Sequence, residues 1–116
     1  MRIISKPTQI KAAGTPAKII EEFIGNVNSS NDEISIARMK SPKGWSEPGQ
    51  TPEFTEYTIV LNGKLVIETK RGKYEIKANE TVIIERGEWV KYSTPYENGA
   101  KYIAICIPAF SPNKVH

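Results

Sequence analysis

The chain has 116 residues, of which 39% are hydrophobic and 25% charged, and its formal net charge at pH 7 is +3. This length fits one domain with one core, and no apolar run approaches the roughly 20 residues that a membrane-spanning helix needs. The sixteen basic residues are dispersed among thirteen acidic ones, which argues against a nucleic-acid partner.

The single cysteine, Cys106, excludes an internal disulfide and agrees with a reducing compartment. The first residues, from Met1 to Pro7, contain no apolar stretch of signal-peptide length. Together these features predict a cytoplasmic protein with neither a membrane nor a nucleic-acid partner.

The N-terminal part, residues 1–32, is predicted to be an extended arm followed by one short helix. Thr15 is a suitable N-cap, Pro16 suits the first helical position, and Gly25 would end the helix. The apolar stripe of this helix would consist of Ile19, Ile20, Phe23 and Ile24. We expect the helix to pack on the outside of a sheet formed by residues 33–116.

From Glu33 onward the hydrophobic period changes to two, which indicates strands. The predicted strands are residues 33–39, 54–61, 64–69, 73–76, 81–85, 89–93 and 102–107. Asn62-Gly63, Arg71-Gly72 and Asn98-Gly99 are predicted hairpin turns, because each offers a glycine where a positive φ is favourable. Short strands with this spacing predict an all-β antiparallel sandwich or barrel, with a C-terminal tail anchored by Phe110.

One motif in this region resembles the first motif of the cupins. Glu56 is followed by six residues and then Gly63, as in the cupin motif in which two histidines precede a glutamate and a glycine. Gln50 and Pro52 stand at the histidine positions, and in the segment that resembles the second motif Val90 stands where the third histidine is expected. The resemblance implies a cupin-type double-stranded β-helix, or jelly-roll, barrel.

The same motifs predict no metal cofactor, because only Glu56 remains of the usual three-histidine, one-glutamate ligand set. The one histidine, His116, is the last residue and is read as solvated. The chain also resembles the metal-free cupins of the ethanolamine-utilisation type. The shared features are the strand from Phe54 to Gly63, Thr94-Pro95 and Pro108-Ala109, within a likeness that covers roughly residues 34–110.

Strand alternation, with Glu56 facing inward as the resemblance implies, selects the candidate site residues. Arg38, Gln50 and Tyr92 are expected inside with Glu56, where Arg38 and Glu56 form either a functional pair or a structural salt bridge. Glu53 is either an acid beside Glu56 or a solvated carboxylate. Three further residues have two readings each: Tyr57 and Trp45 are rim or subunit-interface aromatics, and Cys106 is a buried thiol or a nucleophile without a base.

Two functions of different class remain open from the sequence. In the first, Arg38, Gln50, Glu56 and Tyr92 bind a small polar or carboxylated metabolite without metal or chemistry. In the second, the chain is an isomerase, epimerase or lyase in which Glu56 is the general base and Tyr92 or Glu53 the acid. A hard-ion site made of Glu53, Glu56 and water is a third possibility. The apolar residues of the segment 57–61 also predict a homodimer formed through a sheet.

Overall fold

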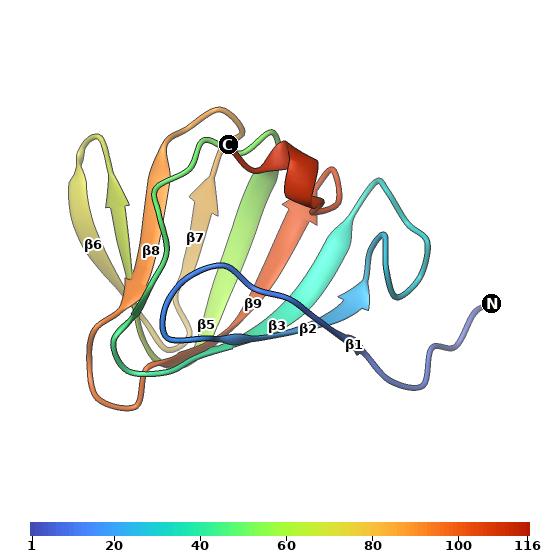
Figure 1. The fold of residues 1–116 in the computed structure, drawn as a ribbon, viewed down its shortest axis with the longest axis horizontal. Helices are drawn as coiled ribbons and strands as arrows, with labels where there is room; N and C mark the ends of the chain where they lie inside the picture. The colour runs from blue at the N-terminus through green and yellow to red at the C-terminus, as the bar shows by residue number, and fades with distance from the viewer.

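The computed structural model describes all 116 residues as nine β-strands and one turn of 3-10 helix (Figure 1). No helix is long and apolar enough to cross a membrane. The strands are β1 (Thr8–Ile10), β2 (Ile19–Ile24), β3 (Ser35–Ser41), β4 (Trp45–Ser46), β5 (Thr55–Thr69), β6 (Gly72–Lys77), β7 (Thr81–Ile84), β8 (Val90–Thr94) and β9 (Ala100–Ile107), and the 3-10 turn η1 is Pro112–Lys114.

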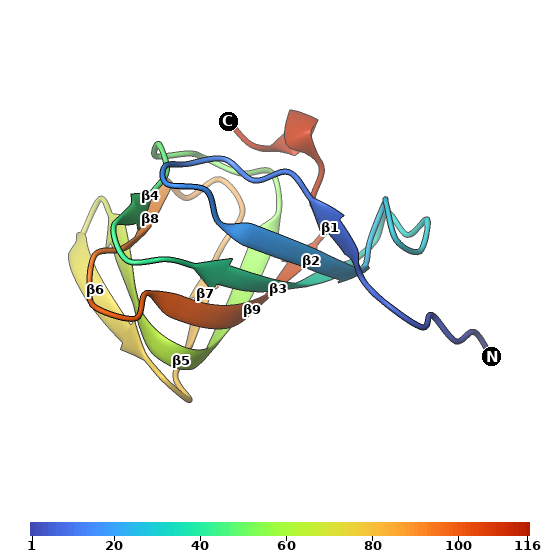
Figure 2. The same ribbon diagram turned by 60° about the horizontal axis from the view of Figure 1, so that its bottom comes forward.

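The strands form two antiparallel sheets that share β5. The first half of β5 pairs with β9 and β7, and β9 continues through β3 and β2 to the edge strand β1. The second half of β5 pairs with β6 and β8, and β8 pairs with β4. The curved wall from β1 to β5 faces β4 and β8, as Figure 2 shows. This is the all-β cupin-type barrel that the sequence predicted.

A bulge in β5 lets this one strand serve both sheets. Its register against β9 shifts between Val60 and Asn62, and Gly63 follows with φ +77°. A Cβ atom at Gly63 would lie 2.1 Å from the carbonyl oxygen of Gly99. Only glycine permits this combination of dihedral angle and close backbone contact.

The N-terminal segment corrects one prediction: residues 19–24 form strand β2 instead of a helix. β2 pairs with β1 on one side and β3 on the other, and its register shifts between Glu22 and Ile24. This bulge interrupts the strict alternation of the strand, so the apolar residues of β2 have a spacing that resembles a helical stripe. Three of the six residues are isoleucines, which favour strands, and a short apolar run does not separate the two structures by period.

Two of the predicted hairpin turns are also wrong. Asn62-Gly63 lies inside the continuous strand β5, and Asn98-Gly99 connects β8 to β9, which belong to different sheets. The hairpin predicted at Arg71-Gly72 is present between β5 and β6, but its turn residues are Lys70 and Arg71, because Thr69 pairs with Gly72. The other predicted strands are present, with ends that differ by up to two residues from the expected ones except where residues 54–61 and 64–69 merge into β5.

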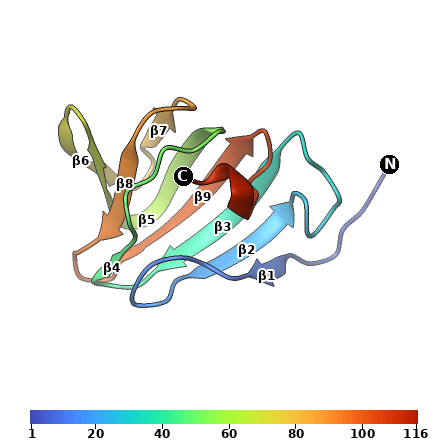
Figure 3. The same ribbon diagram turned by 45° about the horizontal axis from the view of Figure 1, so that its top comes forward.

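The barrel is filled at one end and hollow at the other. The filled end contains Trp45, Leu65 and Val90, each with no exposed surface, packed with Val60, Ile67 and Tyr102. Trp45 is therefore a core residue, which corrects its prediction as a rim or interface aromatic. The hollow end is covered by the C-terminal tail, whose 3-10 turn lies over β3 and β9 (Figure 3).

Candidate functional site

A cavity of about 520 Å³ occupies the hollow end of the barrel. Inward-facing side chains of β2, β3, β5, β8 and β9 line it, together with residues 10–13 of the arm and the C-terminal tail. Thirteen of the 22 lining residues are hydrophobic, so most of the wall is apolar. The largest apolar lining residues are Ile10, Ile20, Met39, Phe54, Phe110 and Val115.

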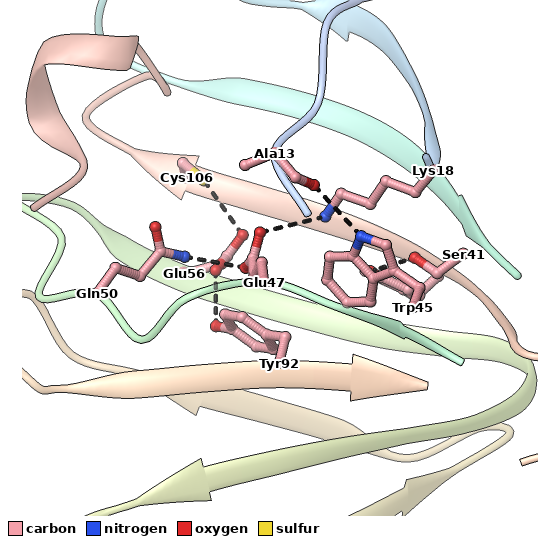
Figure 4. A network of polar contacts seen from close by, with 10 residues as sticks. Ala13, Lys18, Ser41, Trp45, Glu47, Gln50, Glu56, Tyr92 and Cys106 are labelled. Atoms are coloured by element: carbon pink, nitrogen blue, oxygen red, sulfur yellow. Dashed lines mark hydrogen bonds and ion pairs between the residues drawn. The ribbon is translucent and has the colours of Figure 1, made fainter. Parts of the chain in front are cut away.

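Glu56 on β5 is the centre of the first polar group in this cavity. The Tyr92 hydroxyl, from β8, donates a hydrogen bond of 2.7 Å to Oε1 of Glu56. The Cys106 thiol, from β9, lies 3.6 Å from Oε2. Figure 4 shows both contacts, which hold the carboxyl group from two strands on different sheets.

Glu47 and Lys18 form a second polar group beside the first (Figure 4). Glu47 follows β4 and is held by a 3.4 Å backbone hydrogen bond to the Tyr92 carbonyl. Its Oε1 accepts a hydrogen bond of 3.1 Å from the Gln50 side chain, and its Oε2 lies 4.0 Å from Nζ of Lys18. The Lys18 and Glu47 side chains keep only 7% and 10% of their surface exposed.

The backbone around Lys18 explains why it reaches this place. Thr15 and Ser46 exchange two backbone hydrogen bonds of 2.9 and 3.0 Å, which fix the loop before β2 against β4. The Lys18 ammonium lies 4.2 Å from the centre of the Trp45 ring, a distance typical of a cation–π contact. Lys18 therefore crosses the border between the filled core and the cavity.

Burial shifts the acidity of all three charged groups. It raises the pKa of Glu47 to about 7, although Lys18 opposes the shift. It also raises the pKa of Glu56, against the opposing effect of the Tyr92 hydrogen bond. Loss of hydration lowers the pKa of Lys18. The cavity thus holds acids and a base that exchange protons closer to neutral pH than they would in water.

The structure brings three of the predicted site residues together: Gln50, Glu56 and Tyr92 all line the cavity. Arg38 does not join them, because the inward positions of β3 are Ser35, Ala37 and Met39. Arg38 points to the outer face, where its Nε donates a hydrogen bond of 3.0 Å to Glu21. Its guanidinium group also lies over the Phe23 ring. The expected Arg38–Glu56 pair is therefore absent.

Glu53 and Tyr57 also lie outside the cavity lining. Glu53 is exposed, which fits its reading as a solvated carboxylate, and it contacts the His116 ring, which is half exposed and solvated as predicted. Tyr57 alternates with Glu56 on β5 and therefore faces outward, paired with Ile83 of β7. An ion site that needs both Glu53 and Glu56 does not fit this arrangement. Cys106 lines the cavity, and burial raises its pKa, which keeps it a thiol.

Sequence reasoning missed Lys18 and Glu47. Lys18 falls in the segment predicted to be a helix, and Glu47 lies in an irregular connection, where strand alternation does not predict which way a side chain points. One feature of the sequence could have identified Glu47: it is close in sequence to Gln50, which the motif assigns to the cavity.

The positions that hold a metal in other cupins do not fit one here. Gln50 is hydrogen-bonded to Glu47, Pro52 has no donor atom, and Val90 is fully buried in the core. No three histidine, cysteine or acidic side chains lie together in a way that could hold a metal ion. The polar chemistry of this cavity is that of carboxyl, amine, amide and phenol groups.

The barrel topology and its lined cavity define the chain as a cupin-fold protein. No protein-family model matches it. The solved structures that resemble it include the polyketide cyclase RemF of Streptomyces resistomycificus (TM-score 0.78, 15% identity, covering 100% of this chain and 82% of that one). A predicted oxalate decarboxylase of Thermotoga maritima has TM-score 0.75 and 19% identity over 93% of this chain and 98% of that one. The EutQ protein of Clostridium difficile has TM-score 0.64 and 19% identity over 80% and 64%.

A curated relative is much more similar in sequence. The chain is 43% identical over 99 residues to the endoribonuclease YbeY of Myxococcus xanthus. The match covers 85% of this chain but only 34% of that protein, so the chain spans about a third of its length. The structural similarities, all below 25% identity, establish the cupin fold and leave the activity open.

Proposed function

We propose that this cupin binds one small, largely apolar molecule in its cavity without a metal, through a single neutral polar group on that molecule. The observation that carries the proposal is the division of the cavity into apolar walls and one polar cluster of Lys18, Glu47, Gln50, Glu56 and Tyr92. A mostly apolar cavity with a few converging polar groups is typical of small-molecule sites.

The charge balance argues against the carboxylated metabolite expected from the sequence and favours a neutral polar group. Three carboxyl groups (Glu22, Glu47 and Glu56) and two amines (Lys11 and Lys18) line the cavity, and Glu22 already accepts two backbone hydrogen bonds. Arg38, the cation expected to bind a carboxylate, lies outside the cavity. A bound carboxylate would meet Glu47 and Glu56 in a poorly hydrated space, which is unfavourable. A hydroxyl or carbonyl group avoids this repulsion and finds donors in the second amide hydrogen of Gln50 and in protonated Glu47.

Ligand binding to the cavity is tested by thermal shift and by NMR with benzyl alcohol, cyclohexanol and benzoate as probes. We expect the two alcohols to raise the melting temperature and to shift the signals of Glu56 and Tyr92, and benzoate to do so least. Ala37→Leu, which fills the cavity, should abolish these effects, whereas Lys64→Ala on the opposite sheet should preserve them. Equal effects of the alcohols on Ala37→Leu and wild type would reject the cavity as the site.

Proton transfer to or from a bound molecule is the second candidate function. The hydrogen bond between Tyr92 and Glu56 and the raised pKa of Glu56 support it, because a carboxyl group with a raised pKa is a stronger base once ionised. An isomerase or lyase reaction would use Glu56 as the base and Tyr92 or Glu47 as the acid. Exchange of a substrate's acidic hydrogen for deuterium, lost in Glu56→Gln, would support this function over binding alone.

The relatives' activities are weak guides to this chain. The EutQ likeness supports the ethanolamine-utilisation-type label that the sequence motifs suggest, but at 19% identity it carries no reaction. The endoribonuclease activity named for the Myxococcus xanthus protein can lie in the two thirds that this chain does not match. A cytoplasmic location remains a prediction, supported by the single buried free thiol of Cys106.

We also propose a homodimer formed through the outer face of the β3–β9–β5–β7 sheet. Several cross-strand pairs on that face are apolar: Ile36 lies opposite Ile105, Ile59 opposite Ile103, and Tyr57 opposite Ile83, beside the charged Arg38. Ile83 is 52% exposed, which is unfavourable for a monomer. Light scattering should give twice the 13.0 kDa chain mass, and Ile103→Glu should give the monomer mass. A monomeric wild type at micromolar concentration would reject the dimer.

A further inference from the structure

Lys18 is a buried primary amine in a cavity that is otherwise mostly apolar. Its side chain lines the cavity with 7% of its surface exposed, and its only ion-pair contact, to Glu47, is long at 4.0 Å. The Nζ atom makes no hydrogen bond to the protein. Every side-chain nitrogen or oxygen atom that is sealed from solvent does have a hydrogen-bond partner, so Nζ is not sealed and is accessible from the cavity. This lysine is therefore accessible to a small molecule bound there but poorly accessible from outside.

The surroundings of Lys18 shift its equilibrium toward the reactive, uncharged form. Loss of hydration lowers its pKa, with opposing contributions from Glu47 and Glu56. The Trp45 ring and, at 6.0 Å, the Tyr102 ring cover it from the core side. An amine becomes a nucleophile when it loses its proton, and a desolvated lysine does so at lower pH than a surface lysine.

Glu47 supplies the second group that amine chemistry requires. Its pKa of about 7 leaves a large fraction of the carboxyl protonated near neutral pH, and Oε2 lies on the Lys18 side. Gln50 holds the other oxygen, Oε1. A proton donor is therefore fixed next to the nitrogen of Lys18, on the same border of the cavity (Figure 4).

We propose that Lys18 forms a Schiff base with the carbonyl group of a small aldehyde or ketone held in this cavity, with Glu47 as the acid. The inference rests on the proposed function, since it names the polar group of the bound molecule as a carbonyl. It differs from the proton-transfer candidate because the substrate becomes covalently attached to the chain.

Each step of the reaction is balanced. The lone pair of Lys18 Nζ attacks the carbonyl carbon, and the C=O π electrons move to oxygen, which takes the proton of Glu47 and becomes a hydroxyl. The nitrogen returns one proton to the Glu47 carboxylate. Glu47 then protonates the hydroxyl, the C–O bond breaks, and water leaves as the nitrogen lone pair forms the C=N bond. No oxidant, reductant or metal is required.

Borohydride trapping tests this inference directly. The protein is incubated with benzaldehyde or cyclohexanone, reduced with borohydride, digested, and mapped by mass spectrometry. We expect the adduct on Lys18 at least about tenfold faster than on Lys40 or Lys64, and its loss in Lys18→Arg, which keeps a cation in the fold. Labelling confined to surface lysines, or equally fast in Lys18→Arg, would overturn the proposal.

The role of Glu47 needs a readout beyond the rate. Glu47→Gln should slow formation of the Lys18 adduct about tenfold or more and should remove the change of rate near pH 7. Glu97→Gln, which changes an exposed carboxyl paired with Lys43 away from the cavity, is the control and should leave both unchanged. An unaltered pH profile in Glu47→Gln would remove Glu47 from the mechanism.

Benzyl alcohol separates this inference from the proposed function, because it has the same body as benzaldehyde but no carbonyl group. If benzyl alcohol binds and benzaldehyde leaves no adduct on Lys18, the cavity is a binding site and the Schiff base is rejected. If neither benzyl alcohol nor cyclohexanol binds yet Lys18 is trapped, the reactive lysine stands and the proposed binding mode fails.

Discussion

Two ion pairs on either side of one sheet show how facing decides the role of a charged residue. Lys18 and Glu47 meet on the cavity side, with Nζ and Oε2 4.0 Å apart and side chains 7% and 10% exposed. Arg38 and Glu21 meet on the outer side, with Nε and Oε1 3.0 Å apart and side chains 34% and 22% exposed. The better-formed pair is the one that touches solvent, and the poorly formed pair is the one in the cavity.

The two glutamates respond to their surroundings with opposite pKa shifts. The Arg38 hydrogen bond lowers the pKa of Glu21, since water still solvates the carboxylate. Burial raises the pKa of Glu47 even though a lysine lies nearby. A cation therefore lowers an acid's pKa only where its attraction exceeds the cost of removing water. The outer pair is structural, and the inner pair is available for chemistry.

The largest expected effect comes from removing each cation in turn. Lys18→Met leaves Glu47 buried without its partner and should lower the free energy of unfolding at pH 8 by about 3–5 kcal/mol. The loss should be smaller at pH 5.5, where Glu47 is protonated. Arg38→Met, the matched control, should change stability little and equally at both pH values. Urea denaturation measures all four values, and an equal loss for the two variants would erase the distinction between the pairs.

The pH dependence of stability sharpens the same contrast. Glu47 keeps its proton up to about pH 7 in the folded state but loses it near pH 4.5, the ordinary pKa of the group, when unfolded. Between these values the folded state binds more protons, so its stability should fall as the pH rises, by at most about 3 kcal/mol from this group. Glu56, whose pKa is also raised, acts in the same direction.

The Glu47→Gln variant should flatten the fall between pH 4.5 and 7 and leave only the Glu56 part. Glu21 behaves oppositely: its lowered pKa gives stability that is lost only as the pH drops below 4.5, so Glu21→Gln should not alter the curve above that value. Denaturation midpoints across the range provide the test. Lys18, whose pKa is lowered, acts in the opposite direction above its folded-state pKa, so the decisive comparison is between variant and wild type. A Glu47→Gln curve with the same slope as wild type from pH 5 to 7 would contradict the burial of Glu47.

A smaller effect is expected from the hydrogen bond between Tyr92 and Glu56. Tyr92→Phe removes a donor 2.7 Å from Oε1, and because this bond lowers the Glu56 pKa, the variant should raise it further. The stability cost should be about 1–2 kcal/mol. Tyr102→Phe, which loses only a 2.9 Å hydrogen bond with Ser41, is the control. Carboxyl-carbon NMR titration of Glu56 should move in the first variant alone.

The fold could be predicted from the sequence because period-two hydrophobic alternation and turns that contain glycine are local signals. The motif from Glu56 to Gly63 also predicted a cupin-type barrel with Glu56 and Tyr92 pointing inward, and the structure confirms both orientations. The prediction that Arg38 points inward is wrong. Its strand contains no motif residue of known orientation, and an error of one residue reverses the direction of every side chain on a strand. Lys18 and Glu47 lie before or between the strands, where only the backbone bonds between Thr15 and Ser46 place them.

The smallest expected effect concerns a third glutamate pair, at the mouth of the cavity. The His116 ring contacts Glu53, and backbone bonds of Thr51 and Glu53 to His116 and Lys114 hold the tail in place. Val115, between these residues, lines the cavity, so the tail restricts access. His116→Ala should leave stability nearly unchanged, because the pair is exposed, but should speed the exchange of benzyl alcohol about twofold to fivefold. Lys43→Ala, which breaks the exposed pair with Glu97 on a distant turn, is the control. Line-shape analysis by NMR measures the exchange rate, and equal rates in the two variants would show that the tail does not limit entry.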